Sequence, residues 1–381
     1  MIYFDHHATT PPLPAVIDAM GAVMAGSWAN ASSKHGPGQA AARVLAGARS
    51  AVAQALGCKP AEVVFTSGAT EANHLAVRGL LAAAPTGRRR VLFSAAEHAG
   101  HLKLARELMD AGMPVDLIPL QPDGTLHLDA AARLIRSDVA LVSLMAANNE
   151  TGALMPVAEV AALAAAAGAR LHVDATQWIG KRPFHFSEWG ADAVSLSAHK
   201  FNGPKGVGAL LLRQGVPLRP TMPGSQERGR RGGTENLPAI VGLATALEAL
   251  GDLGAEAARQ TALRDRLECA LHSELPGVHI WSRGAPRLPG VSFLRVGNWE
   301  ADVLLSRLER LGFAASSGAA CSSSGSDPSH VLRAMGVPGD EALGAIRLSL
   351  GRTTTDTDVD TLIAVLPTLR SLLPAAQAVA A

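Results

Sequence analysis

The sequence has few cysteines, little excess charge and no long apolar run. Its three cysteines, Cys58, Cys269 and Cys321, lie far apart and form no C-x-x-C pair, which argues against a disulfide framework or a structural zinc site. Lysine plus arginine number 34 and aspartate plus glutamate number 33, so the formal net charge is +1. Such a chain lacks the basic excess that direct binding to nucleic acid or to a membrane surface usually requires.

Signals for membrane insertion and secretion are also missing. No stretch of about 18 uninterrupted apolar residues could span a bilayer. The first ten residues, MIYFDHHATT, lack the charged start and apolar run of a signal peptide. We therefore expect a soluble, cytoplasmic protein without a membrane partner. Of its 381 residues 48% are hydrophobic and 18% charged, so we expect two or three folded domains of roughly 100–200 residues each.

Short apolar runs alternate with helical patterns through the first two thirds of the chain. The predicted strands are 63–65, 90–94, 115–119, 139–145, 170–173, 193–196 and 208–212. The helix predicted over 157–168 ends at Gly168, which can serve as its C-terminal cap. This alternation predicts an α/β fold whose mostly parallel sheet is covered on both faces and binds ligands at the carboxyl ends of its strands. We assign residues 15–250 to this large domain.

The pattern changes near residue 251. We predict a helix over 263–275, a strand over 290–296, a helix over 301–311 and a strand over 345–349. These elements indicate a small α+β domain made of residues 251–381, to which we add residues 1–14. The segment 221–237 is long, glycine-rich and arginine-bearing, and loops of that length in compact proteins are usually functional or mobile.

Two charged residues at predicted strand ends are the first candidates for chemistry. Lys200 follows the strand 193–196 in the run SLSAHK, and a lysine there can form a Schiff base once its ammonium loses a proton. Asp174 ends the apolar strand 170–173. A carboxylate at that place is costly unless a cation pairs with it, and a pyridinium nitrogen would do so. Taken singly, each residue also has an ordinary explanation, Lys200 as a surface lysine and Asp174 as an aspartate that begins the next turn.

Three further features add to these candidates. Gly68-Ala69-Thr70 opens a predicted helix, whose free backbone N–H groups can seat a phosphate. His98 follows a strand end and could stack on a ring or relay a proton. Cys321 stands in the small, polar run SSGAACSSSG, which buries a thiol poorly and so leaves it a candidate nucleophile. Each feature alone also has an ordinary structural reading, as a capped helix, a core histidine or a packing cysteine.

Taken together and in order, these motifs resemble the pyridoxal-phosphate-dependent cysteine desulfurases of the class V aminotransferase family, nearly end to end. The matching segments are YFD (3–5), ATT (8–10), NASSKH (30–35), FTSGATE (65–71), EH (97–98), NNETG (148–152), DATQ (174–177), SAHK (197–200), RGGT (231–234), SGAAC (317–321) and RLSLG (347–351). The long segment from Cys321 to 328–330 is similar to that of the family's long mobile-loop branch, which hands sulfur to scaffold or carrier proteins. The resemblance implies fold type I, with a seven-stranded sheet in the large domain, a small domain that carries the cysteine loop, and a homodimer with shared active sites.

The resemblance also implies roles for individual residues. Lys200 would be the Schiff-base lysine, Asp174 the partner of the pyridine nitrogen, and Cys321 the nucleophile that attacks the substrate sulfur. His98 would stack on the ring and support the thiolate. The remaining assignments are Gln177 and Asn149 to the ring oxygen, Ala69, Thr70, Ser197 and His199 to the phosphate, Thr234 to the phosphate of the partner subunit, and Arg347 with Asn30 to the substrate carboxylate.

The implied activity converts L-cysteine to L-alanine and leaves a persulfide on Cys321 for an acceptor such as an iron–sulfur scaffold or a sulfur-carrier protein. No resident metal is expected, although Cys321 could serve as a transient iron–sulfur ligand. Ala31, Ala198, the run 223–225 and His6-His7 depart from frequent family residues and leave substrate affinity and acceptor choice open. The sequence also does not decide whether the sulfur is used for iron–sulfur cluster assembly or for tRNA thiolation. A selenocysteine lyase, another class V carbon–sulfur lyase and a non-catalytic scaffold of this fold remain alternatives.

Overall fold

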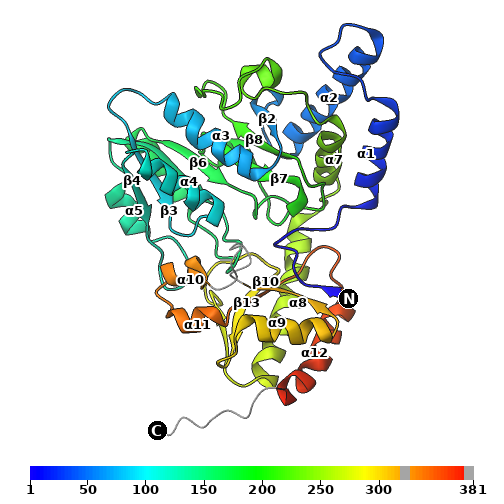
Figure 1. Cartoon of the computed structure of the whole chain (residues 1–381), viewed down its shortest axis with the longest axis vertical. Helices are drawn as coiled ribbons and strands as arrows, with labels where there is room; N and C mark the ends of the chain where they lie inside the picture. The colour runs from blue at the N-terminus through cyan, green and yellow to red at the C-terminus, as the bar shows by residue number, and fades with distance from the viewer. Residues whose placement is uncertain (318–326, 373–381) are drawn as a thin grey trace.

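The computed structural model describes residues 1–317 and 327–372. Figure 1 shows two lobes, a larger one built on a wide sheet and a smaller one that carries the C-terminal helices. Within the described residues, no single helix is long and apolar enough to cross a bilayer. The helices α7 (Leu237–Glu248) and α8 (Leu253–Glu274) meet that length and composition only when taken together, and they are bent by 79° at their junction.

The larger lobe contains a seven-stranded sheet of order β2-β8-β7-β6-β5-β3-β4. Its strands are β2 (Val63–Thr66), β3 (Arg90–Ser94), β4 (Val115–Ile118), β5 (Val139–Met145), β6 (Arg170–Asp174), β7 (Ala193–Ser197) and β8 (Gly208–Leu212). Only β8 runs antiparallel to its neighbours, β2 and β7. The predicted mostly parallel α/β sheet is therefore confirmed, and each predicted strand matches an observed one to within two residues.

Helices cover both faces of this sheet. Along β5, Leu141 packs with α3 (Ala69–Ala82) and α4 (Ala99–Asp110), whereas Val142 packs with the helices of the opposite face. This alternation is what a strand buried on both faces requires. The opposite face is covered by α1 (Pro14–Gly26), α2 (Gly36–Ala55), α5 (Leu128–Leu134), α6 (Val157–Ala167) and α7. Gly168 caps α6 with a left-handed φ of +67°, as predicted.

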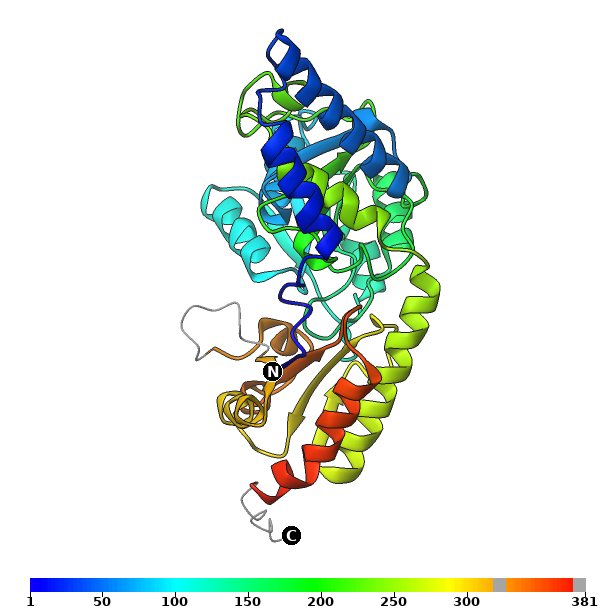
Figure 2. The same ribbon diagram turned by 90° about the vertical axis from the view of Figure 1, so that its right-hand side faces the viewer.

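The smaller lobe has an antiparallel sheet of order β12-β13-β10-β9. Its strands are β9 (Val278–Trp281), β10 (Val291–Val296), β12 (Ser316–Ser317) and β13 (Ile346–Ser349). They pack with α8, α9 (Ala301–Arg310) and α12 (Asp356–Ser371) in a separate core. Figure 2 shows α12 lying alongside α8. The short helices α10 (His330–Ala334) and α11 (Gly339–Leu343) complete the described chain.

The N-terminal residues of the chain belong to the smaller lobe. The first strand, β1 (Ile2–Tyr3), pairs with β11 (Phe313–Ala314), and Phe4 lies in the core of that lobe. The next residues cross to the larger lobe, where the backbone N–H of Thr10 donates to the carbonyl of His199 at 2.9 Å. The chain therefore passes the carboxyl ends of β6 and β7 on its way to α1. The domain limits at 14/15 and 250/251 remain a prediction.

Candidate active site

A cavity of about 590 Å³ opens where the carboxyl ends of β5, β6 and β7 face the smaller lobe. Most of its lining comes from the larger lobe, but Ser317 of β12 and Arg347 of β13 contribute from the smaller one. Its volume lies in the range of small-molecule and cofactor sites. The predicted site residues that line it are Ala69, Thr70, His98, Asn149, Asp174, Gln177, Ser197, His199, Lys200 and Arg347.

Asp174 supplies a buried carboxylate at the end of β6. One carboxylate oxygen accepts from Asn73 Nδ2 at 2.7 Å, and the other accepts from the backbone N–H of Thr176 at 2.9 Å. Burial alone would raise the pKa of this carboxyl, but the hydrogen bonds from Thr176 and Asn73 hold it below its ordinary value. Among the described residues no lysine or arginine forms an ion pair with it. A buried, ionised carboxylate that lines a cavity and has no ion-pair partner there among the described residues favours a cationic ligand.

Lys200 lies directly after β7, in the helical turn Ala198–Lys200. Its amine donates to the backbone carbonyls of His7 at 2.7 Å and Ala8 at 2.8 Å. These acceptors belong to the N-terminal segment that crosses between the lobes, 193 and 192 residues away in sequence. The amine is thereby held at the wall of the cavity that Asp174 also lines.

The N-terminus of α3, with Gly68, Ala69 and Thr70, forms a candidate anion-binding site in another part of the cavity wall, which we call the anion seat. Gly68 precedes the helix with φ of +154°, and no side chain caps the first turn, so its backbone N–H groups remain available. The turn at Gly68 lies against Gly208 of β8. A Cβ on residue 208 would lie only 2.8 Å from the Gly68 backbone, so position 208 requires glycine. Ser197 and His199 line the same cavity, and His199 Nδ1 lies 3.1 Å from Thr9 Oγ1.

Glu71 places a negative charge in this first helical turn, and Arg231 compensates it. Glu71 accepts from the backbone N–H of Ser67 at 2.8 Å and from Arg231 Nε at 2.7 Å. Burial would raise the pKa of Glu71, but the bonds from Arg231 and Ser67 keep it below its ordinary value. The arginine-bearing loop singled out in the sequence therefore contacts the anion seat.

His98 caps α4, and its Nδ1 accepts from the backbone N–H of Gly100 at 3.2 Å. Burial lowers the pKa of His98, with the nearby Lys200 acting in the same direction and Asp174 opposing it. At neutral pH the ring is therefore neutral. Because Nδ1 is an acceptor, Nε2 carries the hydrogen.

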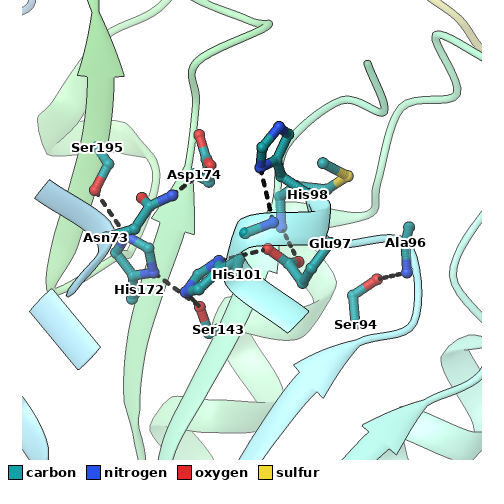
Figure 3. Close-up of polar contacts among 12 residues, drawn as sticks. Asn73, Ser94, Ala96, Glu97, His98, His101, Ser143, His172, Asp174 and Ser195 are labelled. Carbon is teal, nitrogen blue, oxygen red and sulfur yellow. Dashed lines mark hydrogen bonds and ion pairs between the residues drawn. The ribbon is translucent and has the colours of Figure 1, made fainter. Parts of the chain in front are cut away.

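A buried polar chain lies behind Asp174 (Figure 3). Glu97 binds His101 Nδ1 at 3.0 Å, and its other oxygen accepts from the backbone N–H of Met145 at 2.6 Å. Ser143 Oγ lies 3.5 Å from His101 Nε2 and 2.8 Å from His172 Nδ1. The chain ends where His172 Nε2 meets Ser195 Oγ at 2.8 Å. Burial lowers the pKa of His172 to about 3, and the neighbouring His101 acts in the same direction, so the His172 ring is neutral.

Arg347 and Asn149 lie together on the side of the cavity that faces the smaller lobe. Arg347 Nη2 donates to Asp5 at 2.7 Å, and Nη1 donates to the Asn149 carbonyl at 2.9 Å. The buried Nε has no hydrogen-bond partner among the described residues, and neither has Asn149 Oδ1. A guanidinium has five N–H donors, so Asp5 leaves Arg347 with donors to spare for a carboxylate.

Two predicted site residues, Asn30 and Thr234, are not brought to this cavity. Asn30 and Thr234 are exposed and do not line it, and Asn30 Oδ1 accepts from the backbone N–H of Ser32 at 2.8 Å. The placement of Asn30 beside Arg347 is therefore not seen in this chain, and the role of Thr234 across a subunit boundary stays a prediction. Cys321 lies outside the described residues. The other thiols are Cys58, whose pKa burial raises to about 12, and the exposed Cys269.

Four further residues at the site, Asn73, Thr176, Glu71 and Lys181, are not among those predicted from the sequence. Asn73 was detectable as a polar residue on the buried face of α3, next to the predicted anion seat. Glu71 and Thr176 stand inside motifs that had been singled out. Lys181 carried no local signal, because its partners come from the turn before it and from the end of β7.

The comparisons with known proteins agree with this arrangement. A family model described as aminotransferase class-V matches residues 2–362. A cysteine desulfurase of Cereibacter sphaeroides is 45% identical over 98% of this chain and 97% of its own. An IscS-like cysteine desulfurase of Mycobacterium tuberculosis is 42% identical over 96% of this chain and 95% of its own.

Solved structures point the same way. A NifS-like protein superposes with a TM-score of 0.91 at 35% identity, covering 98% of this chain and 100% of its own. A structure described as SspA in complex with cysteine has a TM-score of 0.82 at 30% identity, with 92% and 99% coverage. By sequence and by fold, this chain belongs to the aminotransferase class-V family, among its cysteine desulfurases.

Proposed function

We propose that the protein is a cysteine desulfurase that uses pyridoxal 5'-phosphate to convert L-cysteine to L-alanine and leaves the sulfur on Cys321. The observation that carries the proposal is the convergence of three groups on one cavity: the Asp174 carboxylate, the Lys200 amine and the uncapped N-terminus of α3. The names of the relatives support the reaction, and the neighbour solved with cysteine supports the substrate.

The residues present fit this cofactor. Asp174 offers a buried negative charge for the pyridinium nitrogen, and Asn149 Oδ1 and the Gln177 amide lie in the same wall. The N-terminus of α3, with Ser197 and His199, suits the phosphate. When bound, the cofactor supplies an electron sink for the carbon from which the proton is removed.

The side chains of the protein itself transfer protons, bind the substrate carboxylate and attack the substrate sulfur. Lys200 Nζ, once neutral, takes the α-proton of the substrate and returns a proton later. His98 offers a neutral ring whose Nε2–H can donate toward the reacting groups. Arg347 holds the substrate carboxylate with the donors that Asp5 and Asn149 leave. Cys321, as its thiolate, attacks the substrate sulfur, so that one S–S bond forms while the C–S bond breaks.

Partners and location are proposed on the same basis. We place the enzyme in the cytoplasm as a homodimer, in which Thr234 of one subunit reaches the phosphate of the other. The persulfide then passes to a protein acceptor such as an iron–sulfur scaffold or a sulfur carrier.

Alanine release from L-cysteine tests the function. The cofactor-loaded protein should release alanine repeatedly when a reductant removes the persulfide. Cys321→Ser should keep the cofactor and lose this activity, whereas the exposed Cys269→Ser should behave like the wild type. Turnover by Cys321→Ser would move the nucleophile elsewhere. Selenocysteine as the only productive substrate would favour the lyase alternative.

A further inference from the structure

Lys181 is a buried amine that the reaction above does not use. It follows Gly180 in the turn after β6 and does not line the cavity. Its Nζ donates to Gln177 Oε1 at 3.0 Å and to the carbonyl of Lys200 at 3.3 Å. It therefore lies directly behind two residues of the cavity wall.

The contacts of Lys181 fix the orientation of the Gln177 amide. A lysine ammonium has only donors, so the amide atom that faces it must be the oxygen. On the other side the backbone carbonyl of His7 accepts at 2.9 Å, so the atom facing it must be the nitrogen. The Gln177 side chain is buried, with 4% of the residue exposed. Its NH2 group has a second hydrogen, and the residue lines the cavity.

We propose that Lys181 is a positioning residue that locks Gln177 as a hydrogen-bond donor toward the cofactor's ring oxygen. This inference rests on the proposed function, because it takes Gln177 to face that oxygen. A donor stabilises the ionised form of the ring oxygen, whereas an amide turned by 180° would present Oε1 and favour its protonated form. By fixing the orientation of Gln177, Lys181 thus favours the ionised form of the cofactor's ring oxygen without contacting that oxygen.

The surroundings of Lys181 are consistent with this role. Although the residue as a whole is only half-buried, burial of its amine lowers the pKa of Lys181 to about 7, and the charges of Lys200 and Arg347 act in the same direction. Below that pH the ammonium only donates; above it, the neutral amine can also accept, and its hold on Gln177 Oε1 weakens. The other titratable groups whose pKa values Lys181 lowers are His6, His7 and His199.

Absorption spectra of the cofactor-loaded protein test the proposal. In Lys181→Met the band should shift from the form with an ionised ring oxygen to the shorter-wavelength form with a protonated one, and the cofactor Kd should rise about tenfold, as for one lost hydrogen bond to a charged group. Lys181→Arg, which keeps a cationic donor, should restore both. Lys103→Met, at an exposed site on α4, is the matched control.

A second variant tests the Gln177 donor on which the proposal depends, and Lys181→Arg tests the lysine itself if Lys181→Met fails to fold. Gln177→Glu retains an acceptor for Lys181 but cannot donate to the ring oxygen as a carboxylate, so it should show the same band shift. The double variant should add nothing further. An unchanged band in either single variant overturns the role of Lys181. A wild-type protein that develops no visible band with pyridoxal phosphate would instead overturn the proposed function.

Discussion

At the scale of single residues, Asp174 shows how a buried charge is kept ready for a ligand. Two hydrogen bonds, from Asn73 and Thr176, stabilise its ionised form without supplying a countercharge. Its pKa is depressed in the folded protein. The stability that it contributes is therefore fully present above the unfolded value of about 3.9 and is lost only as the pH falls below that value. Mild acidification to about pH 5 should leave the carboxylate ionised.

Replacing Asp174 by asparagine should show how much the negative charge of the side chain, as distinct from its size, contributes to cofactor binding. The amide keeps the size of the side chain but cannot pair with a pyridinium nitrogen as an anion, so cofactor binding should weaken by about 1.5–3 kcal/mol. Titration of the protein with pyridoxal phosphate measures this, with the exposed Asp110→Asn on α4 as the control. Equal dissociation constants for the two variants would refute the assignment of Asp174.

The sequence could predict Lys200 and Asp174 because both stand directly after buried strands, and parallel strands bring their carboxyl ends to one edge. Asn73 and Lys181 could not be predicted in this way. Their roles depend on how α3 and the turn after β6 pack against those strand ends, which no local pattern records. Asn30 shows the opposite case, because a matching motif did not bring its side chain to the cavity.

At the scale of elements, the segment 221–236 is tied to the strand that precedes the anion seat. Glu227 accepts two hydrogen bonds from Arg49 of α2, at 2.8 and 2.6 Å, and one from the backbone N–H of Phe65 in β2 at 2.9 Å. Its side chain is 1% exposed and that of Arg49 is 10% exposed. Glu227 also adopts a left-handed φ of 46°, a conformation that these contacts must maintain.

Glu227→Ala should therefore be strongly destabilising. It leaves a buried guanidinium without its partner, which typically costs about 3–5 kcal/mol in the free energy of unfolding. Urea unfolding of the cofactor-free protein measures this loss. Glu107→Ala removes a solvent-exposed ion pair with Arg78, and such a change is expected to cost less than about 1 kcal/mol. Similar losses for both variants would contradict the anchoring role of Glu227.

Elements of the larger lobe were easier to predict than those of the smaller one. The strands of the large sheet are rich in apolar residues, so their positions follow largely from composition. By contrast α8 begins at Leu253, ten residues before the predicted start of 263, because Asp252 caps it by accepting from Gly254 and Ala255. The polar, alanine-containing first turns of that helix lack the apolar periodicity on which the prediction relied.

At the scale of the whole molecule, the cavity exists because both lobes and the N-terminal segment meet. The larger lobe supplies Lys200 and Asp174, the smaller lobe supplies Arg347, and the carbonyls of His7 and Ala8 hold Lys200 between them. The pairing of β1 with β11 was not predictable, because it joins two-residue strands that lie far apart in the sequence. The two-lobed α/β architecture itself was predictable from the sequence.

Trapping the cofactor on its lysine shows which amine forms the Schiff base. The loaded protein is treated with borohydride, which makes the bond between cofactor and amine permanent, and the modified peptide is then identified by mass spectrometry. Two other lysines near the cavity, Lys181 behind it and Lys205 in its wall, serve as internal competitors. We expect a pyridoxyl group on Lys200 alone. Modification of Lys181 or Lys205 instead, or no modification at all, would contradict this expectation.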